Sequence, residues 1–202
     1  LLGEAHLISA DFQAAEEAFN SARKLTNNGP GATLGLARAL VAQKRAEEAQ
    51  PHLEGLHKAS PTNPLVNYLR AVVAQHLKDV DGTLEALREV LRIAPNHAQS
   101  LLMMGALSFD RKEYRQAEDF LSRFVSAAPQ HIPARKLLAT VHLALTQNAE
   151  AISTLEGSVN EATDDAQLLA LLGTAYLANR DAENGTRLLE RAAGLDPKAA
   201  AI

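Results

Sequence analysis

Apolar residues recur three and four positions apart along almost the whole chain, as in the segment 168–176. This spacing places them on one face of an α-helix. A short polar break such as 179–181 follows, and a second helical stretch then runs to a proline such as Pro197. The proline ends the helix, because the residue before it is forced out of the α region. No segment alternates with period two, so the pattern predicts an all-α protein.

The helical pattern repeats every 34 residues. Pro61, Pro95 and Pro129 are spaced by 34, and Pro197 follows 68 residues after the third of them. A fixed period of this length is typical of repeat proteins. It divides the chain, with no insertion or deletion, into six repeats within a single solenoid and three left-over residues. The predicted repeats are 1–29 (which lacks its first five residues), 30–63, 64–97, 98–131, 132–165 and 166–199.

Each repeat is expected to contain two helices joined by a short turn. Pro51 lies five residues into one of the second helices and should delay or bend its start. The predicted helices occupy roughly 1–10, 14–27, 31–44, 46–58, 65–77, 81–93, 98–111, 115–127, 132–145, 149–161, 166–179 and 183–195.

Small residues occupy two fixed places in every repeat. The eighth and twentieth places are Gly or Ala throughout, except for Thr83, and the twenty-fourth place is always Leu or Phe. Helices that cross closely need small residues at the crossing and a large side chain beside it. The pattern therefore predicts a helical hairpin in each repeat, with residues such as Ala117 and Ala151 fully buried.

This pattern resembles the tetratricopeptide repeat (TPR) family. The segment 171–197 carries the family's Leu-Gly-x-x-Tyr, small residue, Ala and Pro at the family spacing, and 1–25 matches nearly as well. Arg70 departs from the pattern, since Leu is usual at its place. The resemblance covers the whole chain and implies a right-handed α-solenoid (an α-α superhelix) of six repeats with a concave groove.

By the same resemblance, the first helix of each repeat lines the groove and a protein or peptide partner binds there. Tyr68, Leu102 and Phe109 would be apolar anchors, and polar side chains would orient the partner. Some of these residues could instead cover the seam between helices. The implied partner-binding set is Leu34, Arg38, Tyr68, Val72, Gln75, His76, Gln99, Leu102, Phe109, Asp110, Lys136 and Thr140.

One binding mode of the family is not expected. Members that capture chaperone tails clamp a terminal carboxylate with Lys and Asn four residues apart on a first helix, and with further Asn, Lys and Arg on the following helices. Only Lys136 occupies such a place here, and Thr140 stands where its Asn partner would be. The clamp is therefore absent from this sequence.

Charge and composition narrow the function further. Twenty Lys and Arg against 24 Asp and Glu give a net charge of −4, which disfavours nucleic acid or an anionic membrane surface as a partner. No Cys is present, which excludes thiolate metal sites and Cys nucleophiles. No apolar run approaches 18 residues, so direct membrane insertion of this segment is not expected.

The sequence contains no recognisable catalytic motif. It has no His-Glu-x-x-His, P-loop, G-x-G-x-x-G or G-x-S-x-G, so we expect no enzyme, metal or cofactor. His6 and His142 occupy a core place, and Asp164 and Asp165 begin a helix as capping charges. His97 and His131 are loop residues one repeat apart, which repetition explains.

Two functions compete. The first is a non-catalytic interaction scaffold, and the alternative is a structural module that stacks end to end on further repeats or other copies; a carbohydrate-binding surface is a distant third. The segments 66–87 and 133–156 also resemble the TPR lipoproteins of bacterial exosortase (PEP-CTERM) and exopolysaccharide systems. That resemblance implies a scaffold in envelope protein sorting or polysaccharide export on the periplasmic side; otherwise the protein would be cytoplasmic. The missing initiator Met suggests an excerpt of a longer chain.

Overall fold

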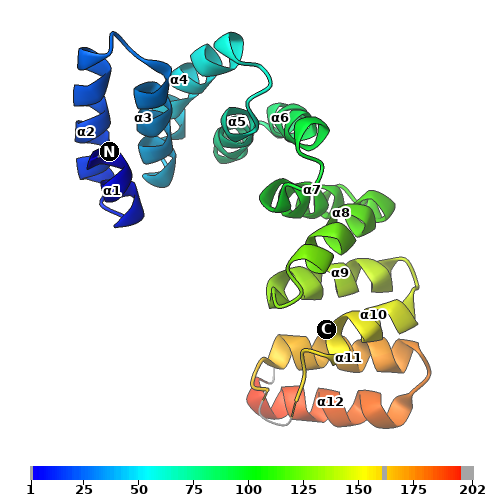
Figure 1. Ribbon diagram of the computed structural model, residues 1–202. Coiled ribbons are helices and arrows are strands. Elements are labelled where there is room, and N and C mark those ends of the chain that lie inside the picture. The colour runs from blue at the N-terminus through cyan, green and yellow to red at the C-terminus, as the bar shows by residue number, and fades with distance from the viewer. Residues whose placement is uncertain (1, 161–162, 197–202) are drawn as a thin grey trace. The chain divides into compact units, whose positions relative to one another are not determined.

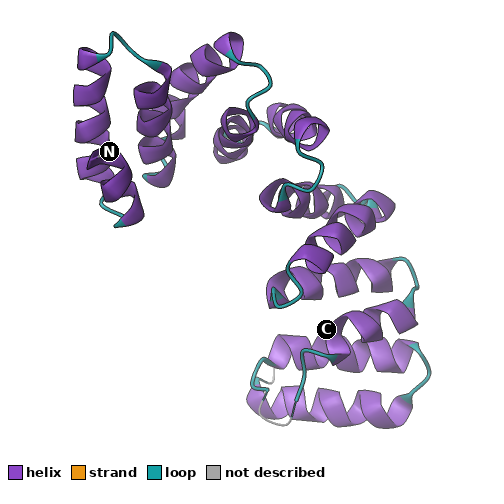
Figure 2. Ribbon diagram, in the orientation of Figure 1, coloured by secondary structure: helices purple, strands orange, loops and turns teal. Residues whose placement is uncertain are grey.

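The computed structural model describes residues 2–160 and 163–196, which form twelve α-helices without a strand (Figures 1 and 2). The predicted all-α class, with paired helices stacked as in an α-solenoid, is confirmed. The helices are α1 (Leu2–Ile8), α2 (Phe12–Leu25), α3 (Pro30–Ala42), α4 (Ala46–Ala59), α5 (Pro64–His76), α6 (Val80–Ile93), α7 (Ala98–Asp110), α8 (Tyr114–Ala127), α9 (Ile132–Ala144), α10 (Asn148–Glu156), α11 (Ala166–Ala178) and α12 (Ala182–Leu195).

The chain divides into two compact halves, residues 1–100 and 101–202. In the first half, each helix from α1 to α6 packs on the next one along the chain, and the first helices α1, α3 and α5 also touch in succession. In the second half, α8 to α12 pack in the same serial way, and α9 touches α11. Each half therefore consists of helices packed on their sequence neighbours.

The small places of the repeat lie at the helix crossings, as predicted. Ala117 and Ala151 are 0% exposed, and Gly or Ala is buried at each of the other eighth and twentieth places. Thr83, the single exception in the sequence, is also buried, and its hydroxyl donates to the Asp79 carbonyl at 2.6 Å. Four of the five Leu side chains at the twenty-fourth place are fully buried beside the crossings, and Leu189 is partly buried; the four are Leu53, Leu87, Leu121 and Leu155.

The turn between the paired helices has the same backbone conformation in every repeat. The middle of its three residues has a positive φ of 58° to 65°, although none of the six is glycine. The next amide bonds back five residues, as from Arg45 N to the Leu40 carbonyl at 2.9 Å, which satisfies the end of the first helix. The turn therefore fixes how the two helices meet. The left-handed residues are Ala10, Lys44, Lys78, Lys112, Thr146 and Arg180.

The predicted helix 149–161 is wrong at its end, because α10 stops at Glu156. Gly157 follows, and glycine costs about 1 kcal/mol inside a helix relative to alanine. The Arg135 guanidinium donates to the Thr154 carbonyl at 2.6 Å, which satisfies an acceptor in the last turn. Val159 then packs on the core from the loop. The part of the predicted helix at 161 lies outside the described residues.

Three smaller expectations are also corrected. The helix predicted over 1–10 ends at Ile8, because the left-handed Ala10 belongs to the turn. Pro51 does not delay α4, which begins at Ala46, since the buried face of that helix packs despite one missing backbone donor. His142 is buried as expected, but the His6 side chain is 30% exposed.

Phe19 and Gly35 show that volume is conserved at the contact between repeats. Phe19 holds the twenty-fourth place, where the other repeats have Leu, and Gly35 holds the sixth place, where the following repeats have Leu or Met. A Cβ on Gly35 would overlap the ring of Phe19, and one on Gly3 would lie 2.8 Å from it. The larger ring is thus accommodated by removing a side chain opposite it.

We predict that Gly35→Ala lowers the free energy of unfolding by roughly 1–3 kcal/mol, because the buried ring cannot move without strain. Phe19→Leu in the same chain should recover much of that loss. Gly55→Ala is the matched control, since Gly55 is exposed in α4 with no atom near its missing Cβ, and it should raise stability by about 1 kcal/mol. Urea unfolding measures all three, and equal shifts for Gly35→Ala and Gly55→Ala would contradict the packing.

Candidate functional site

All twelve predicted groove residues lie on first helices of the repeats. Because the division between the halves falls within α7, Gln99 belongs to the first half and Leu102 to the second. Seven belong to the first half and five to the second. The first-half residues are Leu34 and Arg38 on α3, Tyr68, Val72, Gln75 and His76 on α5, and Gln99 in the first turn of α7. The second-half residues are Leu102, Phe109 and Asp110 on α7, and Lys136 and Thr140 on α9.

Three of the apolar residues are partly committed to the core. Leu34 packs against the core of the first half, and Leu102 and Phe109 pack against that of the second. The Phe109 ring also lies against Tyr114, with centroids 5.9 Å apart. These side chains cover seams between helices, so each presents only part of its surface to a partner.

The cationic residues of the set are neutralised by neighbouring repeats. Arg38 on α3 bonds both carboxylate oxygens of Glu4 on α1, at 2.7 and 2.8 Å. Lys136 on α9 lies 2.9 Å from a carboxylate oxygen of Asp165, which precedes α11. Burial alone would raise the pKa of Asp165, but hydrogen bonds from the Leu168 amide and Lys136 outweigh burial and lower it. Both ion pairs therefore tie successive first helices together.

Asp165 caps α11, as the sequence predicted, by accepting from the Leu168 amide at 2.9 Å. The Thr140 hydroxyl donates to the Lys136 carbonyl of its own helix at 2.9 Å. The polar groups of α9 in the predicted set are thus engaged inside the second half.

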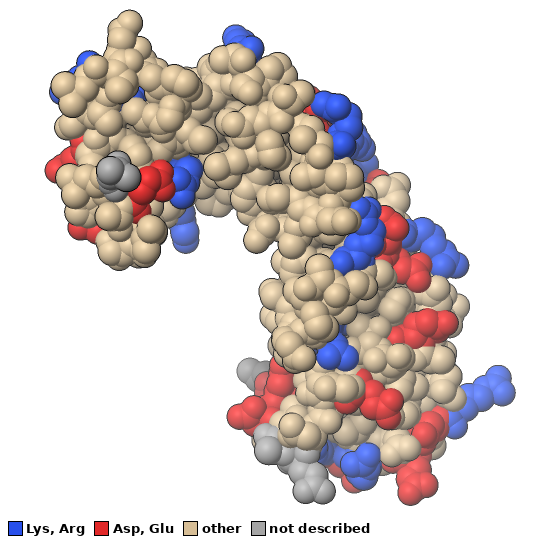
Figure 3. Space-filling model, in the orientation of Figure 1, with Lys and Arg blue, Asp and Glu red and all other residues tan. Residues whose placement is uncertain are grey.

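Uncharged polar side chains are the most accessible part of the set in the first half. Gln75, His76 and Gln99 are exposed. Tyr68 is half-buried beside His97, with ring centroids 5.0 Å apart, and burial raises the pKa of its phenol. In the view of Figure 3, charged residues are sparse over α3 and α5. This surface of the first half can therefore offer hydrogen bonds and one aromatic face with little net charge.

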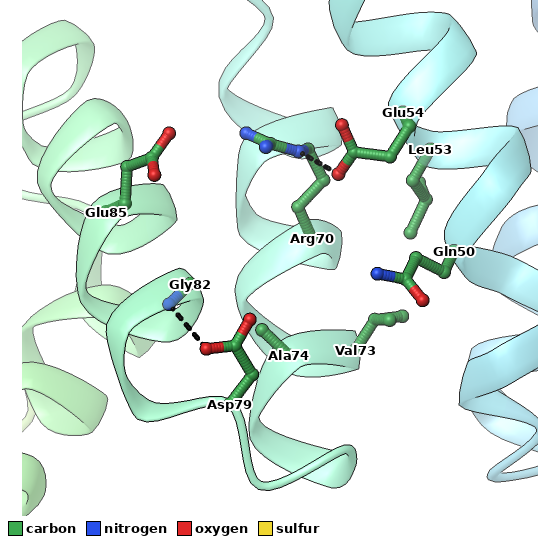
Figure 4. A pocket seen from close by; sticks show the side chains of 9 residues that line it. All are labelled: Gln50, Leu53, Glu54, Arg70, Val73, Ala74, Asp79, Gly82 and Glu85. Atoms are coloured by element: carbon green, nitrogen blue, oxygen red, sulfur yellow. Dashed lines mark hydrogen bonds and ion pairs between the residues drawn. The ribbon is translucent and has the colours of Figure 1, made fainter.

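A separate pocket of about 180 Å³ lies among α4, α5 and α6, and the sequence did not predict it (Figure 4). Arg70 and Glu54 form an ion pair at one end, with Nε and Oε1 2.9 Å apart. At the other end, Asp79 accepts from the Gly82 amide at 2.9 Å. The lining residues are Gln50, Leu53, Glu54, Arg70, Val73, Ala74, Asp79, Gly82 and Glu85.

Two departures from the repeat pattern line this pocket. Arg70 occupies the seventh place, which is Leu or Met in every other repeat, and its side chain is only 15% exposed. Gly82 occupies the nineteenth place, where every other repeat has a side chain. The sequence analysis identified Arg70 as a departure from the repeat pattern. Only the packing of the helices shows that Arg70 and Gly82 line the same pocket.

The described residues contain no group of three or more His, Asp or Glu placed to hold a metal ion. Among them, no helix has the length and apolar character that crossing a membrane requires.

The sequence profile of the tetratricopeptide repeat family matches residues 6–73, 74–139 and 109–175. The chain belongs to the tetratricopeptide repeat family. The profile thus reaches both halves, and the TPR first helices are those that carry the predicted groove residues. The resemblance to the exosortase-associated lipoproteins is not supported by this match or by the relatives below.

Two relatives with similar sequences come from Drosophila melanogaster. The BBSome complex member BBS4 homolog is 28% identical over 123 residues, which is 61% of this chain and 25% of the relative. Protein O-mannosyl-transferase Tmtc3 is 27% identical over 161 residues, which is 67% of this chain and 17% of the relative. The chain therefore spans a quarter or less of either relative.

Solved structures share the fold at low sequence identity. YrrB, described as a TPR protein with an unusual peptide-binding site, superposes with a TM-score of 0.83 at 16% identity, covering 92% of this chain and 97% of YrrB. MamA from Desulfovibrio magneticus RS-1 superposes with a TM-score of 0.71 at 20% identity, covering 84% of this chain and 96% of MamA. At these identities the likeness establishes the TPR fold.

We predict that Arg70→Leu, which restores the residue type of the other repeats, leaves the thermal midpoint unchanged or raises it. Replacing a partly buried ion pair by apolar packing is often neutral or stabilising. Glu54→Ala should lower the midpoint, because it leaves the Arg70 charge without its partner. Thermal unfolding followed by circular dichroism measures both, and a large loss on Arg70→Leu would show that the pair supports the fold.

Proposed function

We propose that this TPR chain is a non-catalytic scaffold that binds an extended peptide or a helix of a partner protein on the surface of its first helices. The observation that carries the proposal is the uncharged surface of the first half, where Tyr68, Gln75, His76 and Gln99 are accessible while Arg38 is paired. The peptide-binding site of the structural neighbour YrrB supports the same class of partner.

The state of these side chains indicates which partner would fit. Tyr68 supplies a half-buried aromatic face, and the amides of Gln75 and Gln99 supply donors and acceptors. Aromatic anchors with surrounding polar contacts commonly carry most of the energy at such interfaces. We therefore infer a partner segment with an apolar anchor and uncharged polar neighbours. In the second half, further contacts would come from side-chain surface that is not used in packing between helices or in ion pairs. The residues concerned are Leu102, Phe109, Asp110, Lys136 and Thr140.

We predict that Tyr68→Ala weakens binding of peptides selected on this chain from a random display library about tenfold, equivalent to about 1.4 kcal/mol. Gln75→Ala should weaken it less, and Gln50→Ala, an exposed glutamine on the second helix α4, is the matched control. Fluorescence anisotropy at low and high salt measures the affinities, which should change little with salt. Loss on Gln50→Ala without loss on Tyr68→Ala would place binding in the α4–α6 pocket instead.

A second function, end-to-end stacking, is supported by an apolar hollow between α1 and α2. The hollow has a volume of about 490 Å³ and includes Gly3, Phe19 and Leu25. Leu2 and Leu25 are 66% and 87% exposed. The later first helices α3 and α5 are each covered on this side by the preceding second helix. A second helix from another copy would match the surface that the hollow presents.

We predict that stacking, if it operates, gives a mass above one protomer at high concentration, and that Leu25→Glu abolishes it by placing a charge in the contact. Light scattering over a concentration series measures the mass. Lys24→Glu, a charge change at the neighbouring exposed position of α2, is the control. A single-protomer mass at every concentration would exclude stacking through this hollow.

The more specific setting, a scaffold in bacterial envelope sorting or exopolysaccharide export, remains a proposal. It is supported by the similarity of the segments 66–87 and 133–156 to that lipoprotein subfamily. An interaction scaffold without catalytic groups of its own is compatible with such a role.

A further inference from the structure

In four successive repeats, the residue directly before the first helix caps that helix with its side chain. Two of these four capping residues are histidines. Asn63 Oδ1 accepts from the Leu65 and Val66 amides at 3.0 and 3.2 Å, and Asp165 caps α11 as described above. At the equivalent places, His97 Nδ1 accepts from the Ser100 amide at 3.3 Å and His131 Nδ1 from the Ala134 amide at 3.1 Å. The sequence interpretation of these histidines as merely repeated loop residues missed this role.

An imidazole caps a helix only in one protonation state. Nδ1 accepts the amide hydrogen only when it carries no proton, which fixes the neutral tautomer with the proton on Nε2. Protonation of Nδ1 removes the acceptor and places a positive charge at a helix N-terminus, where the helix dipole disfavours it. Asn63 cannot undergo this change, and an ionised Asp165 stays an acceptor through the range in which histidine titrates.

The surroundings of His97 favour the neutral ring. The Tyr68 ring of α5 lies against it, and the Ser100 hydroxyl of α7 is 2.9 Å from Nδ1. Burial lowers the pKa of His97, and no charged neighbour contributes to that shift. The hydrogen bond accepted from the Ser100 amide requires the neutral ring, and burial beside Tyr68 disfavours the charged one.

His131 is held at the start of α9 by a ring contact as well as by its hydrogen bond to the Ala134 amide. The Phe124 ring of α8 packs edge-on against it, with centroids 5.1 Å apart. Arg135 of α9 reaches back to the loop before that helix, where its Nη1 donates to the Pro129 carbonyl at 3.4 Å.

We propose that His97 and His131 are pH-sensitive caps, whose protonation loosens the first turns of α7 and α9, and that His97 passes this change to the groove through Tyr68. The switch at the two caps is independent of any partner. Its effect on binding rests on the proposed function, because Tyr68 is the aromatic anchor proposed for the partner. Acidification would then act at the joints between repeats and regulate the groove of the first half.

The test compares amide hydrogen exchange of the full chain at pH 7.5 and pH 5.0, after correction for intrinsic exchange rates. We expect protection of the Ser100 and Ala134 amides to fall about tenfold at the lower pH. The Val66 and Leu168 amides, capped by Asn63 and Asp165, are internal controls and should hold their protection. Nitrogen chemical shifts of the two imidazoles should show the Nε2–H tautomer at pH 7.5.

Two substitutions separate capping from titration. His97→Asn and His131→Asn copy the cap that the chain already uses at Asn63, so they should keep protection at both pH values. His97→Ala and His131→Ala remove the cap, so they should show low protection of the same amides at both. His142 is buried between Thr154 and Glu118 and is retained in every variant, so its own titration cancels from the comparison.

An Nδ1–H tautomer at pH 7.5 would overturn the proposal. The proposal would also be overturned if the Asn variants lost as much amide protection at pH 5.0 as the unmodified chain does. Failure of the Asn variants to fold at pH 7.5 would also overturn it, since the capping place would then require the ring. A library-selected peptide whose affinity changes with pH in the unmodified chain, but not in His97→Asn, supports the coupling to Tyr68. A pH-dependent cap with pH-independent affinity overturns that coupling alone.

Discussion

The close crossing of two helices in each repeat is the constraint on which the rest of the structure depends. Neither helix can bury its apolar face alone, and the crossing brings the backbones close only because the eighth and twentieth places carry Gly, Ala or a buried Thr. The large residue of the twenty-fourth place then fills the space beside the crossing. The pair Phe19 and Gly35 shows that the constraint acts on volume, since a larger ring is matched by the loss of a side chain on the next repeat.

Because the crossings fix the interior, the ends of the helices can vary in chemistry while keeping one geometry. Six different turns share a left-handed residue, and the residues there range from Ala10 to Arg180. The caps of the first helices α5, α7, α9 and α11 are likewise Asn, His, His and Asp, each accepting from an amide in the first turn. A property such as sensitivity to pH can therefore be placed at a joint without altering the packed core.

The sequence predicted most of the fold because a fixed period assigns every residue to a structural place. Its errors arise where the decisive interaction is not local. The end of α10 depends on Gly157 and on a bond from Arg135, nineteen residues before its acceptor Thr154. The candidate site was less predictable for the same reason, since Arg38 meets a carboxylate 34 residues away. The pocket near Arg70 requires side chains from three helices, which no single motif in the sequence joins.

The pairing of charges also bears on how this TPR surface can recognise a partner. Arg38 with Glu4 and Lys136 with Asp165 connect successive first helices, so these charges contribute to stacking of the repeats. A partner that competed for either cation would have to break such a contact and leave a carboxylate unpaired, which opposes binding. Under the proposed function, recognition in the first half falls to neutral groups such as Tyr68 and Gln75. Since His97 lies against the Tyr68 ring, the proposed binding surface and the joint between repeats share one contact, through which a change at the joint would act on a partner.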